Sequence, residues 1–243
     1  MRASDNPSAR DAGQDLRVKP ETVTSRTAAK LRQAISSGRF RPGERLVESS
    51  LCHLMGVSRT TIRETLRRLE AEHLVVNSPN VGPSVAVIDW EAAQQIYEVR
   101  ALLEGEAVAL CAERGSPEII AEIRRALEGF ENAVEQQDSE GRVKTTEDFY
   151  EAILKGCKNG VLADAVRRLN ARVSLLRATS MSRSGRSKES SAELRRIYTE
   201  IAQGDPEGAR LAAKDHVRSA ASAARQVFAE QTSDETETGP RSR

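Results

Sequence analysis

The sequence predicts a mainly α-helical protein in which an N-terminal winged helix-turn-helix domain is followed by an all-helical bundle. Three observations lead to this fold class. Apolar residues recur at helical spacing through most of the chain, a Gly-Val-Ser turn separates two short amphipathic segments, and β-prone runs occur only just after those segments. We therefore divide the chain into a flexible leader (1–22), the winged domain (23–88), the helical domain (89–230) and a disordered tail (231–243).

Three helices and a two-stranded wing make up the first predicted domain. Helical spacing and turn residues set the bounds of the helices, and Ser58 stands where it can cap the third of them. The β-prone runs flank a turn that is rich in Pro, Asn and Gly, which predicts a hairpin. The predicted elements are a helix from Thr24 to Gly38, helices Val47–Met55 and Ser58–Glu72, and strands Leu74–Asn77 and Ser84–Ile88.

Helical periodicity continues almost to the end of the chain after Asp89, so the second domain is predicted to be all-helical. Asn159 and Asp205 stand where they can cap helices, and the serine- and arginine-rich break at 182–187 is predicted to be a mobile surface loop. The predicted helices are Trp90–Arg114, Pro117–Gln137, Gly141–Lys158, Val161–Met181, Lys188–Gln203 and Pro206–Glu230.

The helix that follows the Gly-Val-Ser turn carries two distinct faces. Its buried stripe, at i, i+4 and i+7, is formed by Ile62, Leu66 and Leu69. The face beside that stripe presents Arg59, Thr60, Arg63 and Arg67. An arginine offers a bidentate donor fork that suits guanine edges or phosphate, and a threonine can contact a phosphate or a thymine methyl group. A solvated helix face without a partner is the simpler interpretation, but the preceding tight turn and the following wing favour a surface that binds double-stranded DNA.

The net charge of the chain is only +1, but the basic residues are concentrated in the first domain. Residues 23–88 contain ten basic and five acidic side chains, a net of +5, so the rest of the chain sums to −4. Basic side chains attract the phosphates of DNA, and this attraction is needed only in the domain that contacts the DNA. The charge distribution therefore agrees with DNA binding by the first domain.

Composition narrows the class of protein further. No apolar run approaches the length of a membrane span, and the polar N-terminus has no secretory core, so we expect a cytoplasmic protein. Three dispersed cysteines, Cys52, Cys111 and Cys157, fit reduced buried thiols better than redox sensors. Few histidines, no glycine-rich phosphate loop and no paired-cysteine cluster leave no convergent catalytic set, so the chain is predicted not to be an enzyme.

The first domain resembles the winged helix-turn-helix of GntR-family bacterial transcription regulators over LRQAISSGRFRPGERLVESSLCHLMGVSRTTIRETLRRLEAEHLV and PNVGPSVAVI. The second domain resembles the all-helical effector domain of the FadR-like branch, usually called FCD, over IYEVRALLEGEAVALCAE and SSAELRRIYTEIAQGDPEGARLAAKDHV. Together the resemblances cover nearly all of the chain from Thr24 to Glu230. They imply a homodimer that binds short palindromic operators and whose operator affinity changes when a small organic acid or related metabolite binds the helical domain.

The resemblance also assigns DNA-contact positions. Those of the recognition helix fall on Ser58, Arg59, Thr60, Thr61 and Arg63. The wing position falls on Asn80 and Gly82, and Gly82 also permits the positive φ and close backbone approach that a wing tip beside a phosphate needs. A further contact falls on Ser49, where family members often carry Glu or Arg. Arg67 lies on the same face as the recognition residues, so it can reach a phosphate.

Many FCD domains hold a divalent metal through Asp-x3-His on one helix and a single His on each of two later helices, and the metal then fixes a carboxylate effector. These positions fall on Thr146, Tyr150, Leu194 and His216. Helical phase places all four inward, but a single imidazole supplies one ligand where three or four are needed. Asp148 lies on a different side of its helix from Tyr150, so it is a poor replacement. We therefore expect no metal and no other cofactor.

A pocket that lacks the metal ligands of other FCD domains can still bind an anion or a polar metabolite. Arg100 adjoins an apolar helical stripe, so its guanidinium can turn inward, where the carboxylate of an effector or of the chain's own Glu104 would be its partner. Satisfied core or surface groups are the alternative interpretation of every candidate. The candidate effector-binding residues are Arg100, Thr146, Tyr150, Arg172, Arg177, Leu194 and His216.

The sequence favours a homodimeric transcription regulator controlled by a small effector that resembles an organic acid, with repression favoured by the family resemblance. The alternative is a constitutive or partner-controlled DNA-binding protein whose helical domain is only a dimerisation scaffold. That alternative stays open because loss of the metal ligands can also mean loss of ligand control.

Overall fold

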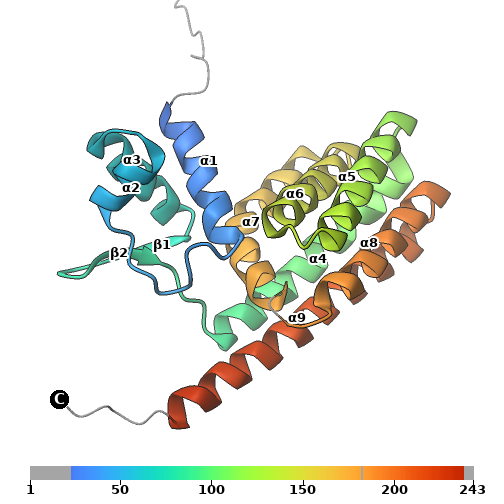
Figure 1. The fold of residues 1–243 in the computed structure, drawn as a ribbon. Coiled ribbons are helices and arrows are strands. Elements are labelled where there is room, and N and C mark those ends of the chain that lie inside the picture. The colour runs from blue at the N-terminus through green and yellow to red at the C-terminus, as the bar shows by residue number, and fades with distance from the viewer. Residues whose placement is uncertain (1–22, 182, 238–243) are drawn as a thin grey trace, which may run out of the picture.

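The computed structural model describes residues 23–181 and 183–237, so the leader predicted at 1–22 lies outside the described residues. A small domain that contains the two strands precedes a bundle of helices, as predicted (Figure 1). None of the helices in these two ranges is both long and apolar enough to cross a membrane. The elements are α1 (Val23–Ser36), α2 (Glu48–Met55), α3 (Arg59–Ala71), β1 (Val75–Ser78), β2 (Gly82–Val85), α4 (Trp90–Arg114), α5 (Pro117–Glu135), α6 (Ser139–Gly156), α7 (Gly160–Met181), α8 (Arg186–Gln203) and α9 (Pro206–Glu237).

The recognition helix α3 forms as predicted. Its N-cap is Ser58, whose Oγ accepts a hydrogen bond from the Thr61 N–H at 3.2 Å. The apolar stripe of the helix is buried against Leu31 and Ile35 of α1, in the core of the first domain. The exposed face of α3 is therefore held on a packed scaffold.

The second strand of the wing begins earlier than predicted. β2 covers Gly82–Val85 rather than Ser84–Ile88, and it pairs antiparallel with β1. A Gly-Pro pair is common in turns, and a proline has no N–H to donate within a sheet. β2 accommodates Pro83 because this residue takes part through its carbonyl, which accepts a hydrogen bond from the Leu46 N–H at 2.8 Å. The prediction for this strand was therefore wrong at both ends.

The turn of the wing is correspondingly short. β1 ends one residue later than predicted, at Ser78, which lies opposite Gly82. Asn80 and Gly82 take positive φ values of 64° and 88° and so reverse the chain. The tip of the wing is therefore a tight turn in which Gly82 itself adds no side chain.

Capping side chains set the starts of four helices in the second domain, α4, α6, α7 and α9. α4 has the predicted bounds, because Asp89 Oδ1 accepts a hydrogen bond at 2.8 Å from the N–H three residues later. α6 begins at Ser139, two residues before the prediction, because Asp138 caps it in the same way at 2.9 Å. Asn159 and Asp205 accept the capping hydrogen bonds of α7 and α9 at 3.1 and 3.0 Å, as predicted.

Helices α8 and α9 each extend into a segment that was predicted to be irregular. α9 continues to Glu237, so the tail predicted to be disordered from residue 231 is helical as far as the structure describes it. No Gly or Pro interrupts the sequence between residue 231 and Gly239. α8 begins at Arg186, inside the predicted loop at 182–187, and the Arg186 side chain is 0% exposed. An ion pair with Glu193 holds this arginine in the interior.

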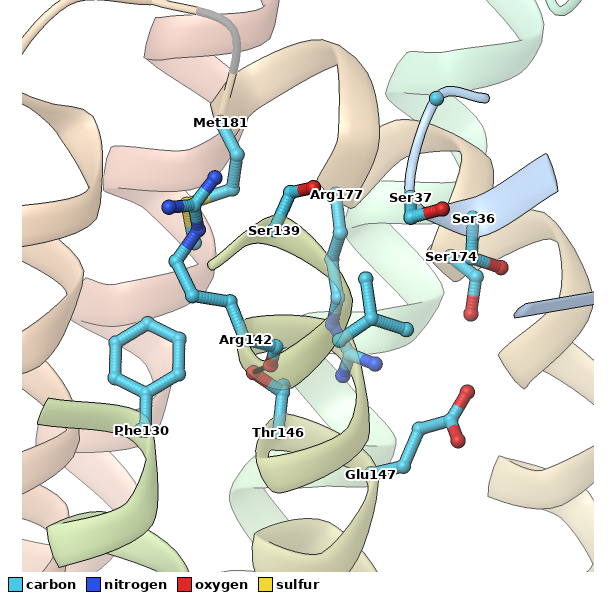
Figure 2. A pocket seen from close by; sticks show the side chains of 12 residues that line it. Ser36, Ser37, Phe130, Ser139, Arg142, Thr146, Glu147, Ser174, Arg177 and Met181 are labelled. Atoms are coloured by element: carbon cyan, nitrogen blue, oxygen red, sulfur yellow. Dashed lines mark hydrogen bonds between the residues drawn. The ribbon is translucent and has the colours of Figure 1, made fainter. Parts of the chain in front are cut away.

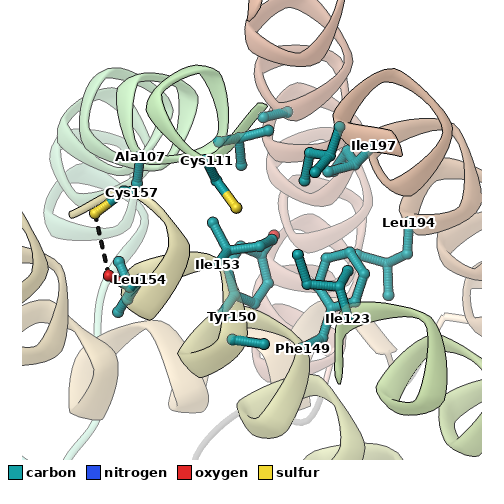
Figure 3. Close-up of a cluster of buried hydrophobic side chains, with 14 of the residues drawn as sticks. Ala107, Cys111, Ile123, Phe149, Tyr150, Ile153, Leu154, Cys157, Leu194 and Ile197 are labelled. Atoms are coloured by element: carbon teal, nitrogen blue, oxygen red, sulfur yellow. Dashed lines mark hydrogen bonds between the residues drawn. The ribbon is translucent and has the colours of Figure 1, made fainter. Parts of the chain in front are cut away.

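The apolar core of the second domain contains two of the three cysteines (Figure 3). Cys111 of α4 and Cys157 after α6 are buried, whereas Cys52 in the first domain is half-buried. Burial and the neighbouring Cys157 raise the pKa of the Cys111 thiol to about 12. This thiol is therefore protonated and unreactive at neutral pH.

The close packing of α6 against α4 makes Gly156 a sensitive position. A Cβ at Gly156 would overlap Cys111 Sγ and lie 2.8 Å from Ile119 Cγ2. We expect Gly156→Ala to lower the free energy of unfolding by about 1–3 kcal/mol, because the core must shift to admit the methyl group. Urea denaturation measures the change. Gly160→Ala is the matched control, because a Cβ there has no neighbour within 4 Å; equal losses in the two variants would contradict the packing argument.

The two domains pack against each other where α1 meets α6 and α7. Leu175 of α7 joins the apolar core of the first domain, alongside Leu31 and Ile35 of α1. α7 therefore belongs to the helical bundle and also contacts the scaffold of the recognition helix.

Candidate DNA-reading face and effector site

The predicted DNA-reading face of α3 is open to solvent. The side chains of Arg59, Thr60, Arg63 and Arg67 are exposed, and Thr61 is half-buried. The Ser58 and Thr61 hydroxyls share a hydrogen bond at 2.9 Å, so both residues also build the start of the helix. These four exposed side chains can therefore meet a DNA groove.

Glu48 of α2 holds the side chain of Arg63. Arg63 Nε lies 3.1 and 3.0 Å from the two carboxylate oxygens of Glu48, although the arginine side chain is 64% exposed. Arg59 and Arg67 form no hydrogen bond or ion pair with any residue in the described part of the chain. Sequence reasoning missed Glu48, because it lies on another helix, 15 positions before its partner.

The wing brings a further arginine, Arg45, to the candidate interface. Arg45 pairs with Ser84 in an isolated β-bridge, and its Nη2 lies 4.0 Å from the position that a Cβ of Gly82 would occupy. Asn80 is exposed at the tip, and Ser49 is exposed at the start of α2. The sequence did not indicate Arg45 as a site residue, because Arg45 lies far from the wing along the chain and reaches it only through its β-bridge with Ser84.

Buried charged side chains form a network inside the second domain. Arg100 Nε and Glu104 Oε1 form an ion pair at 2.7 Å, with side chains that are 1% and 3% exposed. Arg177 Nη2 of α7 lies 3.6 Å from the same glutamate oxygen, and the Arg177 guanidinium lies 4.7 Å from the centre of the Tyr150 ring. The structure thus brings together three of the candidate effector residues, and the carboxylate beside Arg100 is the chain's own Glu104.

The network keeps its charges at neutral pH. Burial alone would lower the pKa of Arg100 and raise that of Glu104, but their attraction outweighs burial, so the pKa of Arg100 is raised and that of Glu104 is lowered. Burial and the positive charge of Arg100 lower the pKa of Arg177. Burial and the charge of Glu104 raise the pKa of Tyr150, so its hydroxyl stays neutral.

His216 of α9 extends the network to α8. Its Nε2 lies 3.5 Å from Arg100 Nη2, and its Nδ1 lies 2.7 Å from Glu193 Oε2. The same glutamate oxygen accepts a hydrogen bond from Arg186 Nη2 at 2.7 Å. Burial lowers the pKa of His216, so the imidazole is neutral at pH 7. Sequence reasoning missed Arg186 and Glu193, because the first lies in a loop-like segment and the second reads as a surface charge.

The positions that correspond to the metal ligands of FCD domains do not fit a divalent ion. The Thr146 hydroxyl donates to the Arg142 carbonyl at 2.7 Å, and Leu194 packs in the apolar core. Both ring nitrogens of His216 have neighbours, and the Arg100 guanidinium beside Nε2 would repel a cation. Within the described residues no group of three or more His, Cys, Asp or Glu side chains is placed to hold a metal.

A cavity of about 230 Å³ lies beside the network (Figure 2). Thr146 and Arg177 line this cavity, whereas Arg100, Tyr150 and His216 belong to the network behind it. Arg172 is half-buried and is not part of the lining. The lining combines the cations Arg142 and Arg177, the hydroxyls of Ser36, Ser37, Ser139, Thr146 and Ser174, the carboxylate of Glu147, and the apolar Phe130, Val143 and Met181, with Gly38 beside Ser37.

Two protein-family models match this chain. The model described as "Bacterial regulatory proteins, gntR family" matches residues 23–85, and the model described as "FCD domain" matches residues 95–219. The first range contains the exposed face of α3 and the wing. The second range contains the buried network and most of the cavity lining.

Individual relatives and solved structures agree with the family models. The chain is 30% identical over 189 residues to the "Uncharacterized HTH-type transcriptional regulator YdhC" of Bacillus subtilis (strain 168), a match that covers 77% of this chain and 82% of that protein. It is 27% identical over 202 residues to the "Probable D-xylose utilization operon transcriptional repressor" of Paenarthrobacter nicotinovorans, covering 83% and 88%. The solved structure of E. coli McbR/YncC has the same fold, with a TM-score of 0.74, 23% identity, and coverage of 87% of this chain and 99% of that one. The chain therefore belongs to the GntR family and is a DNA-binding transcription regulator with an FCD domain, not an enzyme.

Proposed function

We propose that the protein is a homodimeric repressor that binds a palindromic operator in the cytoplasm, and that its operator affinity changes when a small organic acid binds the helical domain. The exposed arginines of α3 and the adjacent wing support operator binding. One recognition helix reads only a few base pairs, so two linked copies on a palindrome multiply the affinity. The relative from Paenarthrobacter nicotinovorans, which is named a repressor, supports repression.

Buried guanidinium donors that lack an acceptor carry the organic-acid proposal. Arg100 and Arg177 share the carboxylate of Glu104, and Arg186 pairs with Glu193 and Glu189. Glu147 lines the cavity together with Arg177. Five guanidinium nitrogens of these arginines have no hydrogen-bond acceptor among the described residues. A buried donor without an acceptor costs about 1–3 kcal/mol, and a carboxylate is the natural acceptor for a guanidinium. A carboxylate that enters the cavity at Arg177 would supply acceptor atoms for this guanidinium.

We propose further that this site works without a metal. The buried guanidinium groups supply the positive charge that a divalent ion would otherwise provide for a carboxylate. The donor set around His216 supplies too few ligands for an ion to bind usefully. Elemental analysis of the purified protein checks this proposal, and a stoichiometric bound ion would overturn it.

A panel of carboxylates tests the effector proposal. Acetate, succinate, benzoate, phenylacetate and octanoate are each compared with the corresponding amide in thermal-shift measurements. We expect at least one carboxylate to raise the melting temperature while its amide does not, because only the charged form pairs with Arg177. The same compound should change the affinity for an operator that the protein has selected from a random DNA pool.

Two variants on one helix provide the controls. Arg177→Met removes the guanidinium that lines the cavity and should abolish the thermal shift, whereas Arg172→Met removes one outside the lining and should preserve it. If no carboxylate raises the melting temperature and none changes the affinity for the operator, the effector proposal fails. A DNA-binding protein with a helical dimerisation scaffold would then remain.

A further inference from the structure

The cavity beside Arg177 is closed on one side by the DNA-binding domain. Ser36 is the last residue of α1, and it lines the cavity together with Ser37 and Gly38 and with residues of α5, α6 and α7. In Figure 2, Ser36 and Ser174 lie at one end of the cavity, and Phe130 and Met181 lie at the other. A molecule in this cavity would therefore touch both domains at once.

One residue of each domain that lines this cavity, Ser36 and Arg177, carries buried polar atoms without hydrogen-bond partners among the described residues. Ser36 is 2% exposed, and its Oγ has no hydrogen-bond partner among the described residues. Arg177 Nε and Nη2 also have none within the same part of the chain. Leaving buried polar atoms unpaired is costly, so a ligand that pairs with both side chains gains free energy from each domain.

The end of α1 is tied to the recognition helix. Arg32 Nη2 of α1 lies 2.7 Å from Glu72 Oε1, at the end of α3, and Leu31 shares a core with Ile62 of α3. Leu175 of α7 packs into that same core, two residues before Arg177. A change at the cavity can therefore reach the DNA-reading face through α1 without passing through a dimer interface.

We propose that the cavity is a ligand site shared by the two domains, in which a small carboxylate binds Arg177 and also contacts Ser36, and so sets the position of the winged domain directly. This inference rests on the proposed function, because it assigns a mechanism of control to the same effector. The ligand is compact, since about 230 Å³ is below the roughly 300–1,000 Å³ of sites for drug-sized molecules. It carries an apolar part that packs on Phe130 and Met181.

A carboxylate attached covalently in the cavity tests this coupling without knowledge of the natural effector. Ser139→Cys, in a Cys52→Ala background, is treated with 2-carboxyethyl methanethiosulfonate, whose disulfide product places a carboxylate in the cavity and releases methanesulfinate. Cys111 and Cys157 are buried and remain unlabelled. We expect the label to change the dissociation constant for the selected operator by about 5- to 150-fold, the usual range for coupled sites.

The controls separate charge, position and contact with α1. Propyl methanethiosulfonate adds a neutral group of similar length and should change operator affinity much less. The carboxylate label at Gln203→Cys, which is exposed at the end of α8, should have no effect. Ser36→Ala should reduce the effect of the label at position 139, and Val143→Cys should reproduce that effect from a second position in the lining.

An unchanged operator affinity, with complete labelling at both cavity positions shown by mass spectrometry, would overturn the coupling. The binding of free carboxylates is measured separately, without DNA. A carboxylate that binds at Arg177 although the labels leave operator affinity unchanged would therefore refute the shared site and leave the proposed effector in place.

Discussion

We expect Arg59→Ala to abolish operator selection. Arg59 is exposed at the first position of α3 and has no partner within the described residues, so its guanidinium is free to meet a base edge. A bidentate arginine contact contributes about 1–3 kcal/mol of discrimination between bases. Two copies in a dimer would then lose about 2–6 kcal/mol, which is at least roughly a 30-fold loss of affinity for the selected operator.

Selection from a random DNA pool, followed by titration of labelled operator, measures this loss. Arg68→Ala is the matched control, because it removes the same side chain from the same helix. Arg68 pairs with Ser25 and Glu72 instead of facing outward alone, so its loss should leave the selected sequence unchanged. Both variants should sediment as the wild type does. If Arg59→Ala selects the wild-type operator with unchanged affinity, the contact assignment is wrong.

The second large effect is expected at the buried ion pair of α4. Glu104→Gln removes the charge that Arg100 and Arg177 share, and Arg100 and Glu104 are almost completely buried. Breaking one side of a buried pair leaves an uncompensated charge, so the free energy of unfolding should fall by about 3–5 kcal/mol. Urea denaturation of the purified protein measures the change.

The exposed pair between Arg124 and Glu128 provides a close control. Both pairs join Arg and Glu four residues apart on a helix, but the Arg124 and Glu128 side chains are 58% and 60% exposed. Glu128→Gln should therefore cost only about 0–1 kcal/mol. Similar losses for Glu104→Gln and Glu128→Gln would show that burial does not determine the strength of the first pair.

The sequence predicted helices well where a capping residue and a breaker frame an apolar stripe. α4 has the predicted bounds, because Asp89 caps its start and Gly115 follows its end. The prediction failed at Gly82, because a Gly-Pro pair is a breaker by composition, while the strand needs only a carbonyl from the proline. It failed at residue 231 because polar composition was taken as disorder in a segment that lacks Gly and Pro until Gly239.

The candidate site shows a different limit of sequence reasoning. Helical phase turned Arg100 inward correctly, since the direction of a side chain depends on its neighbours along one helix. Several partners of the buried side chains lie on other helices. Glu193, for example, pairs with His216, which is 23 positions later in the sequence. No local pattern encodes such a meeting, and no pattern reveals that Ser36 of the first domain lines a cavity beside the second.

The pairing of Arg63 with Glu48 distinguishes Arg63 electrostatically from Arg59 and Arg67 on the exposed face of α3. Arginines that bind phosphate gain free energy by releasing the ions condensed on DNA, which makes their contribution fall as salt rises. The guanidinium of Arg63 is already paired with the Glu48 carboxylate, which a phosphate would repel. The contribution of Arg63 to DNA affinity should therefore depend less on salt concentration than that of Arg59 or Arg67. A guanine edge, with its neutral acceptors, suits such a paired guanidinium better than the backbone does. We therefore expect the contribution of Arg63 to base selection to persist at ionic strengths that weaken the contacts of Arg59 and Arg67.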